Sequence, residues 1–182
     1  MKKSKIDTRV YEKPITSDHN RWRSTGAAVL AATMLFAAGC GQAAGAANLE
    51  GSCGDILATV YENADLDAEL REAMQYYETI TIDESWEMQF LGTEEADYTD
   101  AVCSLPAINV IPYQCVLLRV EDADEVEETK QLLAANADPR KWICVEAESV
   151  VIENVGDVIL FVMADTETAD AIKAAFLALD AS

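Results

Sequence analysis

The stretch NVGDVILFVMADTETADAIKAAF, residues 154–176, decides the fold of this chain. Residues 154–157 have the composition of a tight turn, and residues 158–164 are apolar at every position. An uninterrupted apolar run of this length is typical of a strand that is covered on both faces. Over residues 166–179, apolar residues recur at helical spacing, which predicts a closing helix with one buried stripe.

Patterns before this stretch predict the rest of the domain. Three further strands are predicted, over residues 98–105, 113–120 and 145–153. Further helices are predicted from Ser52, from Asp65, over residues 81–90, and from Asp124 to about residue 136. The helix from Asp65 carries an apolar stripe that reaches Tyr77. We therefore expect one acidic α+β domain over residues 52–182, with a four-stranded, largely antiparallel sheet and helices packed on it.

An apolar run precedes this domain. Residues 27–38 carry no charge, basic residues lie upstream, and Gly39 and Cys40 follow. A helix of about 12–14 residues rises about 20 Å, which is short of the bilayer core of about 30 Å. The run is therefore typical of the apolar region of a cleaved secretory signal peptide. The alternative is an uncleaved anchor or a buried alanine-rich helix.

Residues 37–40, Ala-Ala-Gly-Cys, resemble the lipobox of bacterial lipoproteins. The resemblance implies that the Cys40 thiol receives a diacylglyceryl group and that cleavage falls between Gly39 and Cys40. We expect a signal peptide over residues 1–39, and a lipidated Cys40 with a flexible Gly- and Ala-rich tether over residues 40–51. The covalent lipid on Cys40 would then hold the domain at the outer face of the cell membrane.

Charge narrows the possible partners. Without residues 1–39, the chain keeps 13 − 7 = 6 basic and 33 − 3 = 30 acidic residues, a formal net charge of −24. This charge argues against a nucleic-acid partner, because such binding depends on Lys and Arg at phosphates. It permits binding of cations or basic partners. His19, the single histidine, lies in the segment expected to be removed, which argues against histidine-dependent catalysis and zinc sites. No cofactor is expected.

Four cysteines follow Cys40, and none forms a Cys-x-x-Cys pair. An extracytoplasmic domain could hold them as two disulfides. In that case Cys103 and Cys115 are the favoured pair, because they flank the connection between two predicted strands. The alternative is that the cysteines are reduced and buried as small apolar residues.

One connection has the composition of a partner surface. It consists of Pro106, Ile108, Val110, Ile111, Pro112 and Tyr113. An exposed apolar loop would mark a site for a protein or peptide partner. The alternative is that these side chains seal the edge of the sheet.

Two acidic stretches contain residue types that could bind a metal ion. Acids and an asparagine alternate over residues 63–69 like calcium ligands, but the Gly and the closing Glu that an EF-hand loop requires are missing. A capped, solvated helix start is the better interpretation there. The same holds for residues 121–125, because acidic side chains are favoured at helix N-termini. No metal ligand or catalytic residue is therefore predicted.

The stretch FLGTEEADYTDAVCSLPAINVIPYQCVLLRVED, residues 90–122, and residues 154–176 resemble a family of Gram-positive bacterial lipoproteins. That family is catalogued only as a domain of unknown function. The resemblance implies a lipoprotein with a small α+β domain, and it implies no activity. The helix after Asp124 and the four cysteines depart from the family's pattern.

These observations together favour a membrane-anchored extracytoplasmic lipoprotein. Its domain is expected to be a non-catalytic binding or envelope-interaction module. One alternative is a carboxylate-based cell-wall hydrolase, since glycoside hydrolysis can use two carboxylates without histidine. Another is a cation-binding sensor that uses its acidic loops.

Overall fold

Strand β5 (Val158–Ala164) is the most deeply buried element, and all seven of its residues are buried. The computed structural model describes residues 48–108 and 111–181. Val158, Leu160 and Val162 belong to one hydrophobic cluster, whereas the alternate residues of the strand belong to a second cluster on the other face. The predicted strand and its coverage on both faces are confirmed.

The sheet has five strands rather than the predicted four. All neighbouring strands are antiparallel, in the order β1-β2-β3-β5-β4. The other four strands are β1 (Tyr77–Thr81), β2 (Asp100–Pro106), β3 (Gln114–Arg119) and β4 (Ser149–Val155).

The additional strand, β1, replaces the end of a predicted helix. Asp67, rather than Asp65, caps α2 (Ala68–Ala73), and a single 3₁₀ turn, η1 (Met74–Tyr76), follows. Residues 77–81, Tyr-Glu-Thr-Ile-Thr, are rich in aromatic and β-branched side chains, which suit a strand. Pairing with β2 therefore prevails over the helical stripe that runs through Tyr77.

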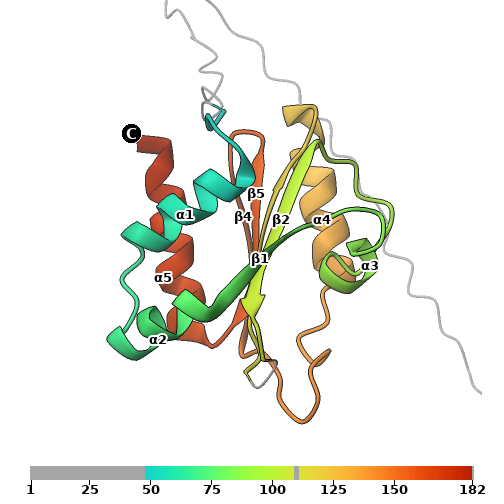
Figure 1. Cartoon of the computed structure of the whole chain (residues 1–182). Helices are drawn as coiled ribbons and strands as arrows, with labels where there is room; N and C mark the ends of the chain where they lie inside the picture. The colour runs from blue at the N-terminus through green and yellow to red at the C-terminus, as the bar shows by residue number, and fades with distance from the viewer. Residues whose placement is uncertain (1–47, 109–110, 182) are drawn as a thin grey trace, which may run out of the picture. The chain divides into compact units, whose positions relative to one another are not determined.

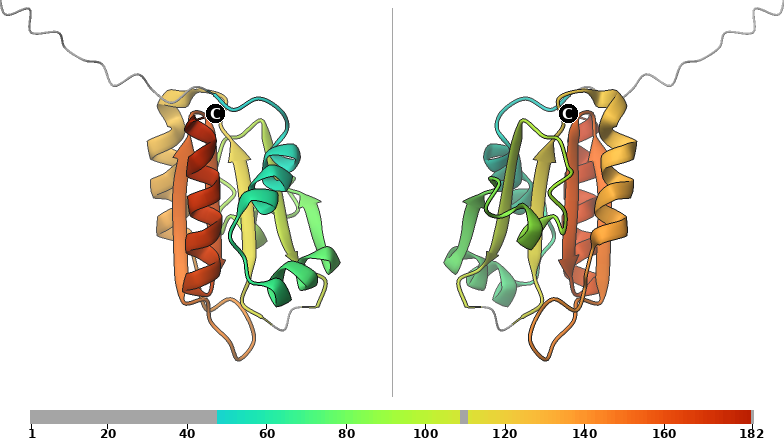
Figure 2. Two further views of the ribbon diagram at one scale, coloured as in Figure 1. Left: turned by 90° about the vertical axis from the view of Figure 1, so that its left-hand side faces the viewer. Right: turned by 90° about the vertical axis from the view of Figure 1, so that its right-hand side faces the viewer.

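Helices cover both faces of the sheet, so the domain has three layers (Figures 1 and 2). One hydrophobic cluster lies between the sheet and α1 (Cys53–Asn63) and α5 (Thr166–Leu177). The second cluster lies under α3 (Glu87–Phe90) and α4 (Val126–Asn136) on the opposite face. Two further 3₁₀ turns are η2 (Ala123–Glu125) and η3 (Ala178–Ala181).

Side-chain caps fix the starts of α1, α2 and α5. Ser52 and Asp55 form the capping box predicted for α1. Asp165 accepts a hydrogen bond from the Thr168 amide and caps α5. The acidic stretch before α4 behaves differently from the prediction, because Asp122, and not Asp124, caps the η2 turn that leads into the helix.

The strand register gives the sheet two distinct ends. At one end Arg119 stands opposite both Asp100 and Val158, and we call this the tether end because Leu49 and Gly51, at the start of the domain, contact Arg119 there. At the other end, the far end, Tyr77 stands opposite Pro106. Strands of six or seven residues separate the two ends by about 20 Å at about 3.3 Å per residue.

The register also corrects the expected disulfide. Cys103 stands opposite Val116, whereas Cys115 comes one position before Val116 in β3 and therefore points to the other face. Accordingly, the two cysteines belong to different hydrophobic clusters, and both are free thiols. The Cys103–Cys115 pairing is therefore wrong. The alternative of buried, reduced cysteine holds for these two and for Cys53, whereas Cys144 is exposed.

The predicted signal peptide, Gly39 and Cys40 lie outside the described residues, so their processing stays a prediction. None of the described helices is long and apolar enough to cross a membrane. The apolar run of residues 27–38 is not among them.

Gly92 joins the α3 and α4 layer through a close backbone contact, which yields a first prediction. Its φ is +76°, and a Cβ placed there would lie 2.4 Å from the carbonyl oxygen of Asn136 at the end of α4. We expect Gly92→Ala to lower the free energy of unfolding by about 2 kcal/mol or more, from backbone strain together with the clash. Urea unfolding measures this change.

Gly54→Ala is the matched control for this substitution. Gly54 lies inside α1, and a Cβ there would meet only the Ser52 Oγ at 3.7 Å. Alanine should therefore leave stability unchanged or raise it by up to about 1 kcal/mol. Equal unfolding midpoints for Gly92→Ala and the wild type would contradict the proposed contact.

Candidate functional site

A groove at the far end of the sheet is the strongest candidate site. It has a volume of about 390 Å³ and lies between the start of α2 and the start of α5. Its apolar lining comes from Leu66, Leu70, Ala73, Tyr77, Ile111 and Ala171. Its charged lining consists entirely of carboxylates, namely Asp65, Asp67, Glu69, Asp165 and Glu167. The groove thus offers an apolar surface inside a negatively charged surround.

Local capping places these carboxylates. Asp67 Oδ1 accepts hydrogen bonds from the amides of Glu69 and Leu70, and Asp165 Oδ1 accepts one from Thr168. Both aspartates are therefore held in position by the helices that they cap. Because α2 and α5 start at the same end of the sheet, their acidic first turns face a common groove.

Three of the carboxylates are not used by the fold. Within the described part of the chain, Asp65, Glu69 and Glu167 form no side-chain hydrogen bond or ion pair, and all three are exposed. No lysine or arginine lines the groove either. Its negative charge is consequently available to a ligand.

Tyr61, Tyr77 and Tyr113 form a cluster of tyrosines beside the groove. The hydroxyls of Tyr61 and Tyr113 are 2.7 Å apart, and the Tyr77 ring meets the Tyr113 ring edge-on at 5.0 Å. Burial, with the nearby Asp165 carboxylate, raises the pKa of the Tyr77 hydroxyl. Among the described residues this buried hydroxyl has no hydrogen-bond partner. Tyr77 therefore brings an unused polar atom to the edge of the groove.

A second cavity, of about 440 Å³, lies on the opposite face and is a weaker candidate. Its cation, Lys141, donates hydrogen bonds to the Gln89 carbonyl and to the Gln114 side chain. The same ammonium lies 5.6 Å from the centroid of the Phe90 ring and 5.4 Å from that of Trp142. Burial lowers the pKa of Lys141. The Lys141 ammonium is already bonded within the protein. This cavity therefore has fewer free charged groups for a ligand than the groove has, although its volume is larger.

The predicted partner surface does not form one exposed patch. Pro106 and Tyr113 are buried and Pro112 is partly buried, whereas Ile108 and Ile111 are exposed by 71% and 39%. Val110 lies outside the described residues. The alternative of sealing side chains therefore holds for Pro106 and Tyr113, and Ile111 is the member that lines the groove.

The acids do not gather as metal ligands. No group of three or more Asp, Glu, Cys or His side chains suited to a metal ion occurs in the part of the chain that the structure describes. Hydrogen bonds from Ser52 and Ser85 lower the pKa of Asp55 and Asp83, respectively, and both aspartates are exposed. These two are therefore unlike the raised carboxylic acid that a glycosidase uses as its proton donor.

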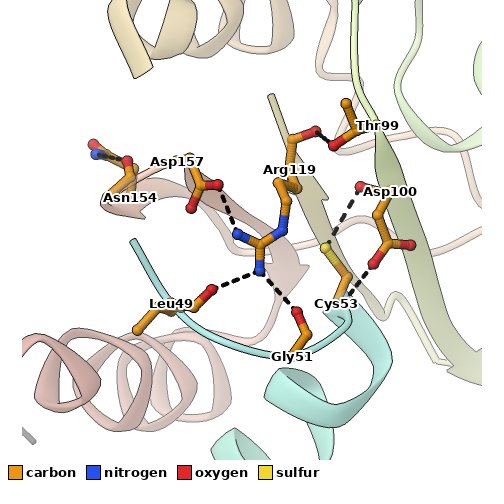
Figure 3. A network of polar contacts seen from close by, with 9 residues as sticks. Leu49, Gly51, Cys53, Thr99, Asp100, Arg119, Asn154 and Asp157 are labelled. Carbon is orange, nitrogen blue, oxygen red and sulfur yellow. Dashed lines mark hydrogen bonds and ion pairs between the residues drawn. The ribbon is translucent and has the colours of Figure 1, made fainter. Parts of the chain in front are cut away.

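Arg119 attaches the start of the domain to the tether end of the sheet (Figure 3). Its guanidinium donates to Asp157 Oδ2 at 2.6 Å and to the carbonyls of Leu49 and Gly51 at 2.8 and 2.9 Å. Beside it, Asp100 Oδ2 accepts a hydrogen bond of 2.7 Å from the Cys53 amide. The last residues of the expected tether are thus fixed to the sheet.

Sequence reasoning found only part of the groove. The acids of residues 63–69 carry a local signal, and their interpretation as a helix start is confirmed by the cap at Asp67. No sequence motif identifies Asp165 and Glu167 as groove residues, since their only local signal is a helix start. The antiparallel register, which no local pattern encodes, brings the two acidic helix starts together.

The Arg119 contacts yield a second prediction. The side chains of Arg119 and Asp157 are only 17% and 11% exposed, so removal of the cation leaves a largely buried carboxylate unpaired. We expect Arg119→Met to lower the free energy of unfolding by about 2–3 kcal/mol, between the values typical of surface and of buried pairs. Urea unfolding measures the loss, and faster amide exchange over residues 51–53 should accompany it.

Arg140→Met is the matched control. Arg140 is exposed, and its guanidinium has no hydrogen-bond partner among the described residues. Its replacement removes the same charge and should change stability by less than about 0.5 kcal/mol. If the two variants unfold at the same urea concentration, the Arg119 contacts do not hold the domain together.

Comparison with known protein families, with curated proteins and with solved structures finds no match to this chain. The lipoprotein family resemblance of residues 90–122 and 154–176 therefore stays a prediction. The role of the groove has to be argued from its own geometry and chemistry.

Proposed function

We propose that this chain is a lipid-anchored, non-catalytic binding module that holds an amphipathic organic cation in the far-end groove. The observation that carries the proposal is an apolar groove of about 390 Å³ whose charged lining is entirely carboxylate. Ligand sites in proteins are typically concave, mostly apolar and supplied with a few polar groups that fix orientation. This groove combines an apolar surface with carboxylates, so its charged groups carry only one sign.

The arrangement of charge favours an organic cation over a metal ion. A metal ion needs several oxygens at one point, at 2.3–2.6 Å for calcium, whereas these carboxylates surround an apolar surface without converging. A ligand with ammonium or guanidinium groups on an aliphatic body would match both features. Its body would cover Leu70 and Ala171, while its cations would face Glu69 and Glu167.

The position of the groove supports display away from a membrane. Arg119 holds Leu49 at the tether end, whereas Tyr77 and Ile111 line the groove at the far end. Lipidation of Cys40 would leave residues 41–48 as the link to Leu49, a reach of at most about 30 Å. A domain tethered in this way presents its tether end toward the bilayer and its groove toward the surroundings.

Titration with hexylamine tests the groove. We expect saturable binding followed by NMR, with the largest shifts at the methyl groups of Leu70 and Ala171 and none with uncharged hexanol. Glu69→Gln combined with Glu167→Gln should weaken binding at least five-fold, because it removes two carboxylates that the fold does not use. Ala171→Trp should fill the groove and abolish binding.

The matched control is Glu62→Gln combined with Glu121→Gln. Both glutamates are exposed and lie outside the groove lining, so the net charge changes equally without any change at the site. This variant should bind hexylamine within two-fold of the wild type. Equal weakening in both double variants would mean that net charge alone attracts amines, and the groove proposal would fail.

The intact mass of protein extracted from membranes tests the anchor. We expect a chain that starts at Cys40 and carries acyl chains, and Cys40→Ser should abolish this modification. Burial raises the pKa of the Cys53 and Cys115 thiols to about 12 and also raises the pKa of the Cys103 thiol. Native alkylation at pH 8 should therefore label only Cys144 among the four described cysteines. A full-length mass starting at Met1 would overturn the lipoprotein proposal and leave the groove proposal in place.

A further inference from the structure

Strand β1 presents a free edge of the sheet. The structure describes β2 as its only paired neighbour, and Figure 2 shows β1 at one margin of the sheet, with α4 beside β4 at the opposite margin. Glu78, Thr79 and Thr81 are exposed. The edge is therefore accessible along the length of the strand.

The hydrogen-bond pattern shows which backbone groups face outward. The Ile82 amide donates to the Ala101 carbonyl at 2.9 Å, in line with the β1–β2 register. Antiparallel pairs alternate between bonded and non-bonded positions, so Glu78 and Ile80 also bond to β2. The amide and carbonyl groups of the alternate residues Thr79 and Thr81 therefore point to the open edge, whereas the Tyr77 amide donates to the Met74 carbonyl at the end of η1.

Strand β1 carries only part of the usual protection against pairing with another chain. It is short and has the charged Glu78 at its second position, and both features discourage aggregation. However, it contains no proline and its register with β2 is continuous, without a bulge. A suitable partner strand would find the free amide and carbonyl groups of two outward-facing residues, Thr79 and Thr81.

Charge selects the class of partner. Glu78 lies within the strand, and Asp83 and Glu84 lie two and three residues after its end, all of them exposed. A second copy of this chain is disfavoured, since residues 48–182 carry a formal charge of −24 in each copy. A segment rich in lysine or arginine would instead gain favourable interactions with these carboxylates.

We propose that the free edge of β1 binds an extended, basic segment of another polypeptide by strand addition. Backbone hydrogen bonds to Thr79 and Thr81 would hold the segment, and the acidic side chains would select for basic residues. Thr79 and Thr81 do not line the groove, so this second binding site does not depend on it.

Hydrogen exchange with a defined peptide tests this proposal. The probe is an eight-residue peptide that alternates lysine and valine, added to the full chain. In the free protein, the Thr79 and Thr81 amides should exchange fast and the Ile80 amide slowly. Peptide binding should slow the exchange of Thr79 and Thr81 at least ten-fold. Raising the salt from 50 to 500 mM should weaken binding, because the selectivity is electrostatic.

Two controls separate backbone pairing from charge attraction. The same peptide with N-methyl groups on four consecutive residues keeps its charge but cannot pair, so it should bind at least ten-fold more weakly. On the protein, Thr79→Pro removes an outward amide without removing a bond to β2 and should weaken binding to the same extent. Thr79→Val keeps the amide and should bind within two-fold of the wild type.

Three outcomes would overturn the proposal. The peptide could bind without slowing the exchange of Thr79 and Thr81, or a glutamate–valine peptide could bind equally well. Alternatively, self-association at high protein concentration could protect these amides without peptide, which would make the occupant a second copy. The N-methyl comparison needs no variant, so the test stands even if Thr79→Pro fails to fold. Hexylamine binding by Thr79→Pro would show that the groove is intact when the edge is blocked.

Discussion

The burial of β5 on both faces is the constraint on which the rest of the structure depends. Its seven apolar residues contribute to two hydrophobic clusters at once, so each helical layer packs against this strand. Burying a large aliphatic or aromatic side chain stabilises a fold by about 1.5–3 kcal/mol. Because β5 couples the two clusters, neither helical layer can separate from the sheet without exposing it.

The surface uses polar contacts where the core uses apolar ones. At the tether end, Arg119 converges with Asp157 and two backbone carbonyls, and Asp100 fixes the first amide of α1. At the far end, carboxylates cap α2 and α5, but other acids have no described partner. At the tether end these charged groups are paired within the protein, whereas at the far end several carboxylates have no described partner. This difference distinguishes an attachment point from a recognition surface.

Local patterns in the sequence were sufficient for elements that one physical signal dominates. The strand at residues 158–164 was predicted from uninterrupted apolarity, and the capping box at Ser52 from its spacing. The strand at residues 77–81 was missed because Tyr77 also continues a helical stripe, and only pairing with β2 resolves that ambiguity. The groove was beyond local reasoning, because its residues are separated by about a hundred positions in the chain and meet through the sheet topology.

The placement of the cysteines has a consequence for how the domain matures. Cys103 and Cys115 occupy opposite faces of the sheet, and they and Cys53 are sealed in the interior as thiols. Secreted domains of small size often rely on oxidation to reach a stable state. Here the four described cysteines form no disulfide with one another, and the two buried clusters pack through apolar side chains. A reductant therefore has no cross-link to break within the described core.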